Sequence, residues 1–204
     1  MPRPRSLTQT DIATAALAVV DRTGLTSLTM RSVATELGMG TMSLYRYVTD
    51  REQLEGLVVD LVLSGVDLAP PCGDWARQVA VLAERVRAAL AAHPAVVPLT
   101  LTRRHAAVGT LRFGERILEI LTRAGFTGRA RVIALRSLLA YVVGAIQQEH
   151  LGALSGPGTA ALAALPPEDF PYLAENAHAA RGVPADEEFR GGLDALLRGL
   201  RTGH

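Results

Sequence analysis

The sequence predicts an all-α protein, and three observations lead to that prediction. Apolar side chains recur at helical spacing in most segments, and no segment shows the period of two that is typical of a strand. Apolar residues make up 49% of the chain but aromatic residues only 4%, so the core is expected to consist of Ala, Leu and Val, as in packed helices. Most periodic segments begin at a capping residue and end at Gly or Pro, the usual boundaries of helices.

Four short helices are expected in the first third of the chain, each with its own boundary signals. They cover residues 8–23, 30–37, 41–48 and 50–66. Residue types that accept hydrogen bonds from the first N–H groups of a helix precede three of them, as Thr8, Thr29 and Asp50. Gly38 stands where a residue in the left-handed conformation ends a helix, so the second and third helices are expected to meet at a tight turn.

Longer helices are expected in the rest of the chain, after a break at residues 69–73. They cover about 74–93, 108–124, 128–151 and 186–201, and a long loop with room for a short helix is expected over 153–184. The predicted domains are a small one over 1–50, followed by a linker helix over about 50–66, and a larger one over 67–204.

The composition excludes several classes of function. Cys72 is the only cysteine, so neither a disulfide framework nor a cysteine zinc site is expected, and the predicted location is the reducing cytoplasm. The N-terminus lacks the apolar core of a signal peptide. The longest apolar run, 138–146, is too short to cross a bilayer, so no membrane partner is expected. With a net charge of +1, any contact with nucleic acid must come from a local patch.

The stretch GMGTMSLYRYV, residues 38–48, has two glycines one residue apart, as in loops that bind the phosphates of a dinucleotide. Such a loop directly follows a strand, but residues 30–37 have a helical pattern, and Ser43 stands in place of the third glycine. This interpretation is therefore rejected, and no cofactor is expected. What remains is a helix, a tight turn and a second helix, the helix-turn-helix pattern whose second helix enters a groove of DNA.

The face of the third helix that points away from Leu44 and Val48 has side chains suited to DNA. It consists of Thr41, Met42, Ser43, Tyr45, Arg46 and Tyr47. Thr and Met can contact a thymine methyl group, Arg can bind guanine or phosphate, and Tyr hydroxyls bind phosphate oxygens. The alternative is that the two tyrosines only fill out a small domain. The turn spacing and the surface chemistry together favour DNA recognition.

The segment LTMRSVATELGMGTMSLYRYVTDREQL resembles the DNA-binding domain of TetR-type transcriptional repressors, and the resemblance is specific over residues 8–66. A looser similarity to the tetracycline-repressor branch covers Trp75, 93–94, 124–126, 141–144 and 189–199. The resemblance implies an all-helical homodimer that binds a double-stranded DNA operator and releases it when a small-molecule effector fills a pocket in the larger domain.

The resemblance also implies roles for individual residues of the small domain. The residues expected at base edges are Arg31, Thr41, Met42, Ser43 and Arg46. The residues expected at phosphates are Thr29, Tyr45, Tyr47 and Arg51. Arg3 and Arg5 are expected either to reach along a groove or to belong to a solvated tail.

In the larger domain the sequence departs from the tetracycline branch, which binds a magnesium-chelated drug through polar side chains and a histidine. The aligned positions hold the poor metal ligands Leu82, Leu101, Ile117 and Gln148. His105, Glu149 and His150 are nearby alternatives, but no metal is expected. The expected pocket is mainly apolar with polar anchors, and comprises Leu82, Val86, Leu101, His105, Ile117, Val132, Leu135, Leu139, Gln147 and Gln148.

Two helices supply apolar surface for a homodimer. Helix 128–151 is apolar on more than one face, so it must be covered on all sides, and helix 186–201 has one clean apolar stripe. Two such helices from each chain can form a four-helix seam. The expected contacts are Val142, Val143, Ile146, Phe189, Leu193, Leu196, Leu197 and Leu200, with packing inside one chain as the alternative.

Two functions from different classes follow. The first is a ligand-responsive repressor that binds a palindromic operator as a homodimer and is released by a small, mainly apolar effector. The second is an all-α small-molecule carrier or enzyme in which the first three helices are only structural. Glu149 and His150 form an acid–base pair, but it lacks a nucleophile or metal partner at suitable spacing, so no enzyme is expected. A carrier would have no use for Arg31 or the surface over 41–47, which favours the repressor.

Overall fold

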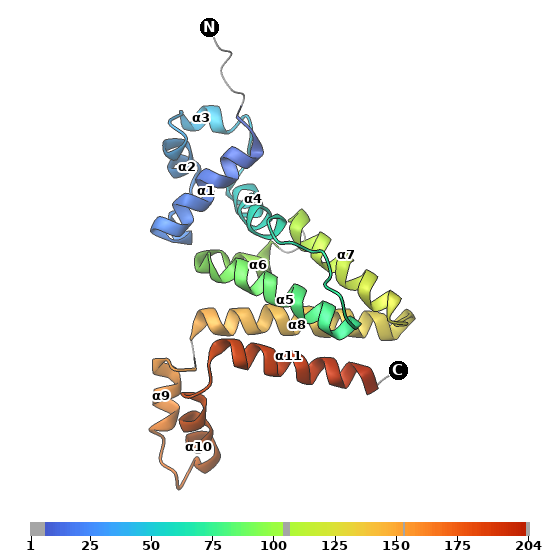
Figure 1. Cartoon of the computed structure of the whole chain (residues 1–204). Helices are drawn as coiled ribbons and strands as arrows, with labels where there is room; N and C mark the ends of the chain where they lie inside the picture. The colour runs from blue at the N-terminus through green and yellow to red at the C-terminus, as the bar shows by residue number, and fades with distance from the viewer. Residues whose placement is uncertain (1–6, 104–106, 153, 203–204) are drawn as a thin grey trace. The chain divides into compact units, whose positions relative to one another are not determined.

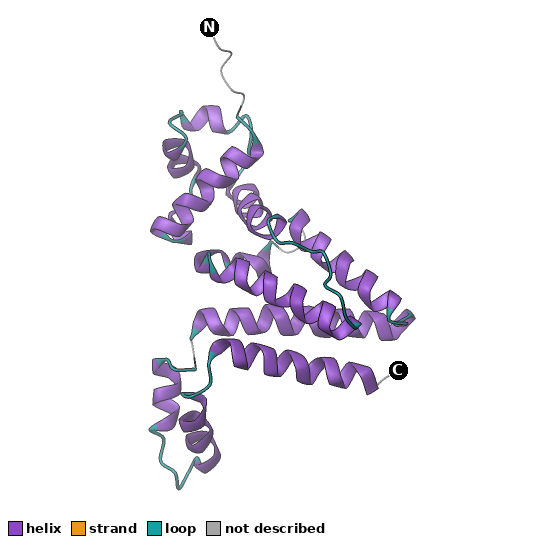
Figure 2. Cartoon of the chain, viewed as in Figure 1, coloured by secondary structure: helices purple, strands orange, loops and turns teal. Residues whose placement is uncertain are grey.

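Every regular element in the described part of the chain is a helix, which confirms the predicted all-α fold (Figure 1; Figure 2). The structure is a computed structural model that describes residues 7–103, 107–152 and 154–202. The helices, in chain order, are α1 (Gln9–Thr23), η1 (Leu25–Ser27), α2 (Met30–Glu36), α3 (Thr41–Leu44), α4 (Arg51–Ser64), α5 (Trp75–Ala91), η2 (Pro94–Val96), α6 (Leu99–Thr102), α7 (Val108–Arg123), α8 (Gly128–Leu151), α9 (Pro157–Ala163), α10 (Pro171–Ala180) and α11 (Ala185–Thr202).

Helices α1 and α4 begin where the sequence predicts, because their capping residues make the expected hydrogen bonds. The Asp11 N–H donates to Thr8 Oγ1 over 3.1 Å, and the Thr8 N–H donates to the Asp11 carboxylate over 2.9 Å. At the start of α4, the Gln53 N–H donates to Asp50 Oδ1 over 2.8 Å. Each cap satisfies an N–H group that has no partner inside its helix, and so fixes the point at which the helix begins.

The turn between α2 and α3 depends on Gly38, whose φ of 66° lies in the left-handed region. The helix after the turn is shorter than the predicted 41–48, since α3 ends at Leu44. The chain continues as a tighter turn, in which the Tyr47 N–H donates to the Leu44 carbonyl three residues back over 2.9 Å. The residues beyond Leu44 therefore do not extend a regular α-helix.

The chain forms two compact units, which are described separately. The first consists of the residues up to Ala69 together with Glu84–Ile117, and the second of Pro70–Ala83 together with the residues from Leu118 onward. Helix α5 begins in the second unit and ends in the first, and α7 begins in the first unit and ends in the second. This division differs from the boundaries expected at residues 50 and 67, which remain a prediction about functional domains.

In the first unit, α1 packs on α2 and α4, and α2 packs on α3. The side chains between these helices are completely buried, namely Ile12, Leu28, Leu44, Val48 and Leu54. Burial of each such side chain contributes about 1.5–3 kcal/mol. Helices α1–α3 and the turn that follows them, residues 9–48, are called the helix-turn-helix segment below. Most of its apolar residues are covered within this unit, and Met42 is an exposed exception.

The first unit also contains short helices that were not predicted from the sequence, namely η1 after α1, and η2 and α6 within residues 94–102. Pro94 and Pro98 interrupt the apolar periodicity, but Pro94 lies in the first turn of η2 and Pro98 precedes α6, positions where proline suits the start of a helix. Helix η2 contacts α1, and α6 contacts α4. These short helices therefore connect the segment 94–102 to both helices of the first unit's core.

In the second unit, α8 and α11 lie side by side (Figure 1). The Tyr141 hydroxyl donates to the Phe189 carbonyl over 2.8 Å, and the two rings are 5.9 Å apart. Near its C-terminus, α11 is attached to the start of α5, because the Arg201 guanidinium pairs with Asp74 and lies 5.7 Å from the centre of the Trp75 ring. Helices α9 and α10 form a hairpin between α8 and α11, where a long loop with one short helix was expected.

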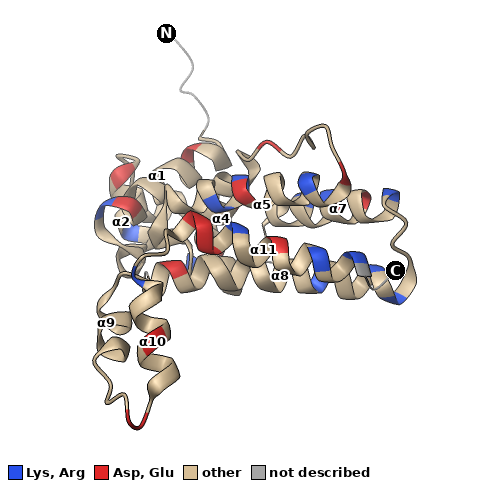
Figure 3. Ribbon diagram, turned by 60° about the horizontal axis from the view of Figure 1, so that its bottom comes forward, with Lys and Arg blue, Asp and Glu red and all other residues tan. Residues whose placement is uncertain are grey.

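Acidic and basic residues are interspersed along α7 and α11 (Figure 3). Ion pairs one helical turn apart join Arg123 to Glu119 on α7, and Arg190 to Asp186 on α11. Exposed pairs of this kind contribute little to stability. They mark the sides of these two helices that face solvent.

Candidate nucleic-acid interface and ligand region

The predicted DNA-facing surface is exposed in the first unit. Leu44 and Val48 are completely buried, and the side chains between them point outward. Met42 is 80% exposed. Arg31, Arg46, Tyr45 and Tyr47 are also exposed, while Thr41 and Ser43 are half-buried. The helix-turn-helix segment therefore presents these seven predicted contact residues on its surface.

Two of the residues predicted to contact phosphates already have partners within the protein. Thr29 caps α2, because its Oγ1 accepts the Ser32 N–H over 3.0 Å. Arg51 donates from Nε to Glu55 Oε1 over 2.9 Å and from Nη2 to the Leu25 carbonyl over 3.2 Å. The Arg51 side chain nevertheless remains 46% exposed. Its Nη1 has no hydrogen-bond partner among the described residues, so it can still donate to a phosphate.

A cluster of charges that the sequence analysis missed joins α4 to the end of α6. Arg103 donates from Nε to Glu55 Oε2 over 2.9 Å and from Nη1 to Glu52 Oε2 over 2.9 Å. The hydrogen bonds to Glu55 and then to Glu52 raise the pKa of Arg103 above its ordinary value. The spacing of Arg51 and Glu55 on one helix could have been noticed, but Arg103 is 48 residues from Glu55 and has no local signal.

Glu55 is the central residue of this cluster. It is only 7% exposed, and its two carboxylate oxygens accept from different guanidinium groups, one from Arg51 and the other from Arg103. A carboxylate so deeply buried requires cationic partners, since an uncompensated buried charge is strongly destabilising. Arg51 also connects α4 to η1 through the Leu25 carbonyl, and Arg103 connects α4 to the end of α6.

Helix α4 has a second close contact, with the start of α7. The Gly109 N–H donates to Asp60 Oδ1 over 2.7 Å. A Cβ atom at Gly109 would lie 2.7 Å from the Ser64 nitrogen and 2.8 Å from Leu63, so no larger residue fits without movement of α4. The first unit thus holds α4 near each of its ends.

The residues predicted to form the ligand pocket are distributed over both units. Leu82 and Ile117 are buried, Leu101 and Val132 are 45% and 56% exposed, and Gln148 is exposed. Val86 is also buried, and the half-buried residues of this set are Leu135, Leu139 and Gln147. His105 lies outside the described residues. The pocket itself remains a prediction. Within the described ranges, no group of three or more His, Cys, Asp or Glu side chains is arranged to hold a metal ion.

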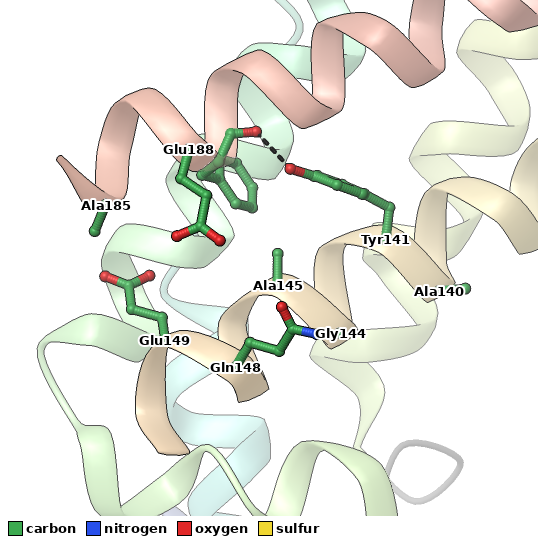
Figure 4. Close-up of a pocket in the computed structure, with 9 residues that line it drawn as sticks. Ala140, Tyr141, Gly144, Ala145, Gln148, Glu149, Ala185 and Glu188 are labelled. Atoms are coloured by element: carbon green, nitrogen blue, oxygen red, sulfur yellow. Dashed lines mark hydrogen bonds between the residues drawn. The ribbon is translucent and has the colours of Figure 1, made fainter. Parts of the chain in front are cut away.

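A groove of about 270 Å³ runs between α8 and α11 in the second unit. Its walls combine small residues with larger polar and aromatic ones, and Tyr141 lies along one side (Figure 4). Glu149 on α8 and Glu188 on α11 direct their carboxylates toward the same opening (Figure 4). The groove contains Gln148 but none of the other predicted pocket residues.

The predicted dimer contacts fall into two groups. Five are buried within the protomer, where they pack α8 and α11 against neighbouring elements: Val142, Ile146, Phe189, Leu193 and Leu197. They would therefore add little area to a seam between two copies. Val143, Leu196 and Leu200 are only half-buried and keep surface for a partner. Packing within one chain, the alternative considered for this stripe, thus accounts for most of it.

Helix α8 leaves much of its apolar surface uncovered. An 18-residue window of this helix has a mean hydropathy of 1.4, yet only 22% of the window is buried. By length and composition alone, α8 is the one described helix that could cross a membrane, a criterion that helices of soluble proteins also meet. The uninterrupted apolar run over 138–146 is much shorter than this window, so it did not indicate a helix of this kind. The exposed residues include Val132 and Ile133.

A helix-turn-helix segment followed by a larger helical part is the architecture of a class of transcriptional regulators. The family described as "Tetracyclin repressor-like, C-terminal domain" matches residues 69–203. The chain therefore belongs to the TetR family of regulators, as the resemblance of residues 8–66 predicts.

Individual relatives agree with this assignment. The chain is 33% identical to the HTH-type transcriptional repressor DrrR1 of Streptomyces coeruleorubidus over 150 residues, which are 72% of this chain but only 55% of that protein. It is 28% identical to the class D tetracycline repressor of Escherichia coli, with 96% of this chain and 90% of that protein covered. The crystal structure of ActR from Streptomyces coelicolor in complex with (S)-DNPA superimposes with a TM-score of 0.83 at 30% identity, covering 97% of this chain and 98% of ActR.

Proposed function

We propose that this protein is a ligand-responsive transcriptional regulator of the bacterial cytoplasm, a repressor without enzymatic activity. In this proposal it binds a palindromic operator as a homodimer, and a small, mainly apolar organic effector releases it. The observation that supports the proposal most directly is the exposed side of the helix-turn-helix segment, where Met42, Arg46 and Tyr45 face solvent above the buried Leu44. The relatives with printed functions are repressors or regulators of transcription.

DNA recognition is assigned to the residues predicted from the sequence. Arg31 at the start of α2 and the side chains of α3 lie on an exposed surface, and their hydrogen-bonding groups and methyl groups suit base edges in a major groove. Tyr47 and Arg51 are proposed to bind phosphates, Arg51 through the part of its guanidinium that is not held by Glu55. In this reading residues 1–50 form the DNA-binding domain, α4 the link, and residues 67–204 the effector-binding and dimerisation domain.

The homodimer is proposed to form on the exposed sides of α8 and α11. The groove between them is lined by small residues, among them Ala140, Gly144 and Ala185, which permit close approach of another helix. Val143 on α8 and Leu196 on α11 are only half-buried and so retain apolar surface. A two-fold seam here implies an operator with two half-sites about 34–36 Å apart, or a small multiple of that distance.

The effector is proposed to be an organic molecule that binds without a metal. ActR, the similar protein from Streptomyces coelicolor, forms complexes with actinorhodin and with (S)-DNPA. Leu101 and Gln148 occupy positions where the tetracycline branch places polar metal or drug ligands, so we assign the pocket to apolar contacts. The decisive measurement is a titration of such compounds against the protein–DNA complex with and without a chelator. A response that disappears with the chelator would refute the metal-free pocket.

DNA selection separates the repressor from the alternative, an all-α carrier or enzyme. A pool of random-sequence duplexes is passed over the immobilised protein, and the retained DNA is amplified and sequenced over several rounds. The repressor should enrich one palindromic sequence, whereas a carrier should enrich none. Arg31→Ala is expected to lose preference at one position of each half-site, and Tyr47→Phe should weaken all sequences alike.

A further inference from the structure

Arg51, which is proposed to contact a DNA phosphate, shares the buried carboxylate of Glu55 with a second arginine. Arg51 Nε donates to Oε1 over 2.9 Å. Arg103 occupies the other oxygen, Oε2, with Nε at 2.9 Å and Nη2 at 2.8 Å. A guanidinium pairs most strongly with a carboxylate when it binds both oxygens at once. As long as Arg103 is in place, Arg51 cannot form that two-point pair.

We propose that Arg103 and Glu55 are positioning residues that set whether Arg51 is available to a phosphate of DNA. When Arg103 holds Oε2, Arg51 is attached to Glu55 through Nε only and to the Leu25 carbonyl through Nη2. Its Nη1 is then the nitrogen that remains for a phosphate, on a side chain that is 46% exposed. When Arg103 leaves, the buried carboxylate has one cation left, and Arg51 turns to bind both oxygens. Arg51 is then withdrawn from the DNA surface. This inference rests on the proposed function.

The location of Arg103 connects this change of partners at Glu55 to the binding of the effector. Arg103 directly follows α6, whose Leu101 is 45% exposed and is among the residues predicted to line the pocket. Helix α6 is a single turn of Leu99–Thr102, so a displacement at Leu101 is passed to Arg103 two residues later. Arg103 also holds Glu52 over 2.9 Å, which makes it the only described side chain that pairs with two acidic residues of α4.

The test uses salt dependence, because each phosphate contact adds about 0.9 to the slope of log affinity against log salt. The probe is the duplex that the wild-type protein selects from the random pool. Arg51→Gln should lower the slope by roughly 1.8 for a dimer, since one contact is lost in each protomer. Arg103→Gln should lower it by the same amount, although Arg103 itself does not contact DNA. Arg112→Gln, at an exposed position of α7, removes an equal charge and should leave the slope unchanged.

Rescue distinguishes positioning from damage to the fold. In the double variant with Glu55→Gln and Arg103→Gln, no buried carboxylate remains to attract Arg51, so the slope should return to the wild-type value. Circular dichroism confirms folding of each variant. If Arg103→Gln does not fold, Arg103→Lys serves instead and should lower the slope in part, because a single ammonium nitrogen cannot reproduce the contacts that three guanidinium nitrogens make with Glu52 and Glu55.

The outcomes separate the two proposals. If no duplex is enriched by the wild-type protein, the proposed function fails. If a duplex is enriched but Arg103→Gln, or the Lys variant in its place, keeps the wild-type slope, or if the double variant does not regain it, the positioning role of Arg103 and Glu55 is refuted while the repressor proposal stands.

Discussion

The helix-turn-helix segment and α8 differ in how far their apolar side chains are buried. In the first unit, Ile12 and Leu44 are completely buried between neighbouring helices of the same unit. On α8, Val132 is 56% exposed and Ile133 is 50% exposed. Only 22% of the 18-residue apolar window of this helix is buried. The contrast indicates that the helix-turn-helix segment completes its core within one chain. Helix α8 instead keeps apolar surface for something outside the protomer, which we propose to be a second copy and an effector.

The largest effect is expected from a cavity in the core of the first unit. Leu44→Ala should lower the free energy of unfolding by about 2–5 kcal/mol, because it removes a completely buried side chain. The measurement is urea unfolding followed by circular dichroism. Met42→Ala, two residues away and 80% exposed, is the matched control and should change the value by less than about 0.5 kcal/mol. Equal effects of the two substitutions would remove the contrast between the two regions.

The next largest effect tests whether α8 and α11 depend on a partner. Leu196→Glu places a charge on the half-buried side of α11 and should weaken a dimer at least about 100-fold, or 2.7 kcal/mol. Sedimentation over a range of concentrations measures the mass. Arg129→Glu, an exposed position at the start of α8, makes a larger change of charge and should leave the mass unchanged. A wild-type protein that is monomeric at micromolar concentration would contradict the proposed seam.

A smaller effect is expected at the DNA surface, where side chains are exposed and contribute nothing to the core. Arg31→Ala should lower affinity for the selected duplex by about 1–3 kcal/mol and relax one position of its half-site. The free energy of unfolding should stay within about 0.5 kcal/mol of the wild-type value. Gel-shift titration against single-base variants of the duplex gives both affinity and preference. Unchanged preference would remove Arg31 from the base-reading set.

The smallest effect compares acid sensitivity at one helix cap in each unit. Hydrogen bonds from the Gln53 N–H and then from Thr49 lower the pKa of Asp50, and bonds from the Arg77 N–H and then from Arg201 lower the pKa of Asp74. A lowered pKa stabilises the folded state above the unfolded carboxyl's pKa, and this stabilisation is lost as pH falls through the folded value. Asp50→Asn and Asp74→Asn should each flatten the fall in melting temperature below about pH 4. If the melting temperature of each variant falls below about pH 4 as steeply as that of the wild-type protein, the lowered pKa values of Asp50 and Asp74 are contradicted.

The first four helices and the turn could be predicted because their signals are local. Thr8 and Asp50 cap the helices that follow them, and Gly38 has the left-handed conformation that its position requires. The end of α3 was predicted too late, since Leu44 and Val48 are four apart in either a helix or the tighter turn that the chain adopts. The exposed residues of that surface could be named, but their contacts with DNA stay predictions.

The segment after α5 could not be predicted for the opposite reason. Pro94 and Pro98 break the periodicity on which sequence analysis depends, so η2 and α6 left no pattern. The role of Arg103 depends on acidic residues 48 and 51 positions earlier, which only the fold brings into contact. On α11, the apolar stripe was recognised, but sequence periodicity alone does not say whether Phe189 and Leu193 face their own chain or another.

The close approach of Gly109 to α4 has a mechanical consequence. The contact lies near Leu63 and Ser64, while the helix begins at Arg51, so the distance from the contact to the N-terminus of α4 is about 18–20 Å at 1.5 Å per residue. If α4 turns about this fixed point, the displacement grows with distance from it. A rotation of about 5° moves the N-terminus by roughly 1.5 Å at that radius. Such a displacement would stretch the 2.9 Å contact between Arg103 and Glu52 beyond hydrogen-bond length. Because Gly109 fixes the far end of α4, a small rotation of the helix would therefore be enough to break the Arg103–Glu52 pair.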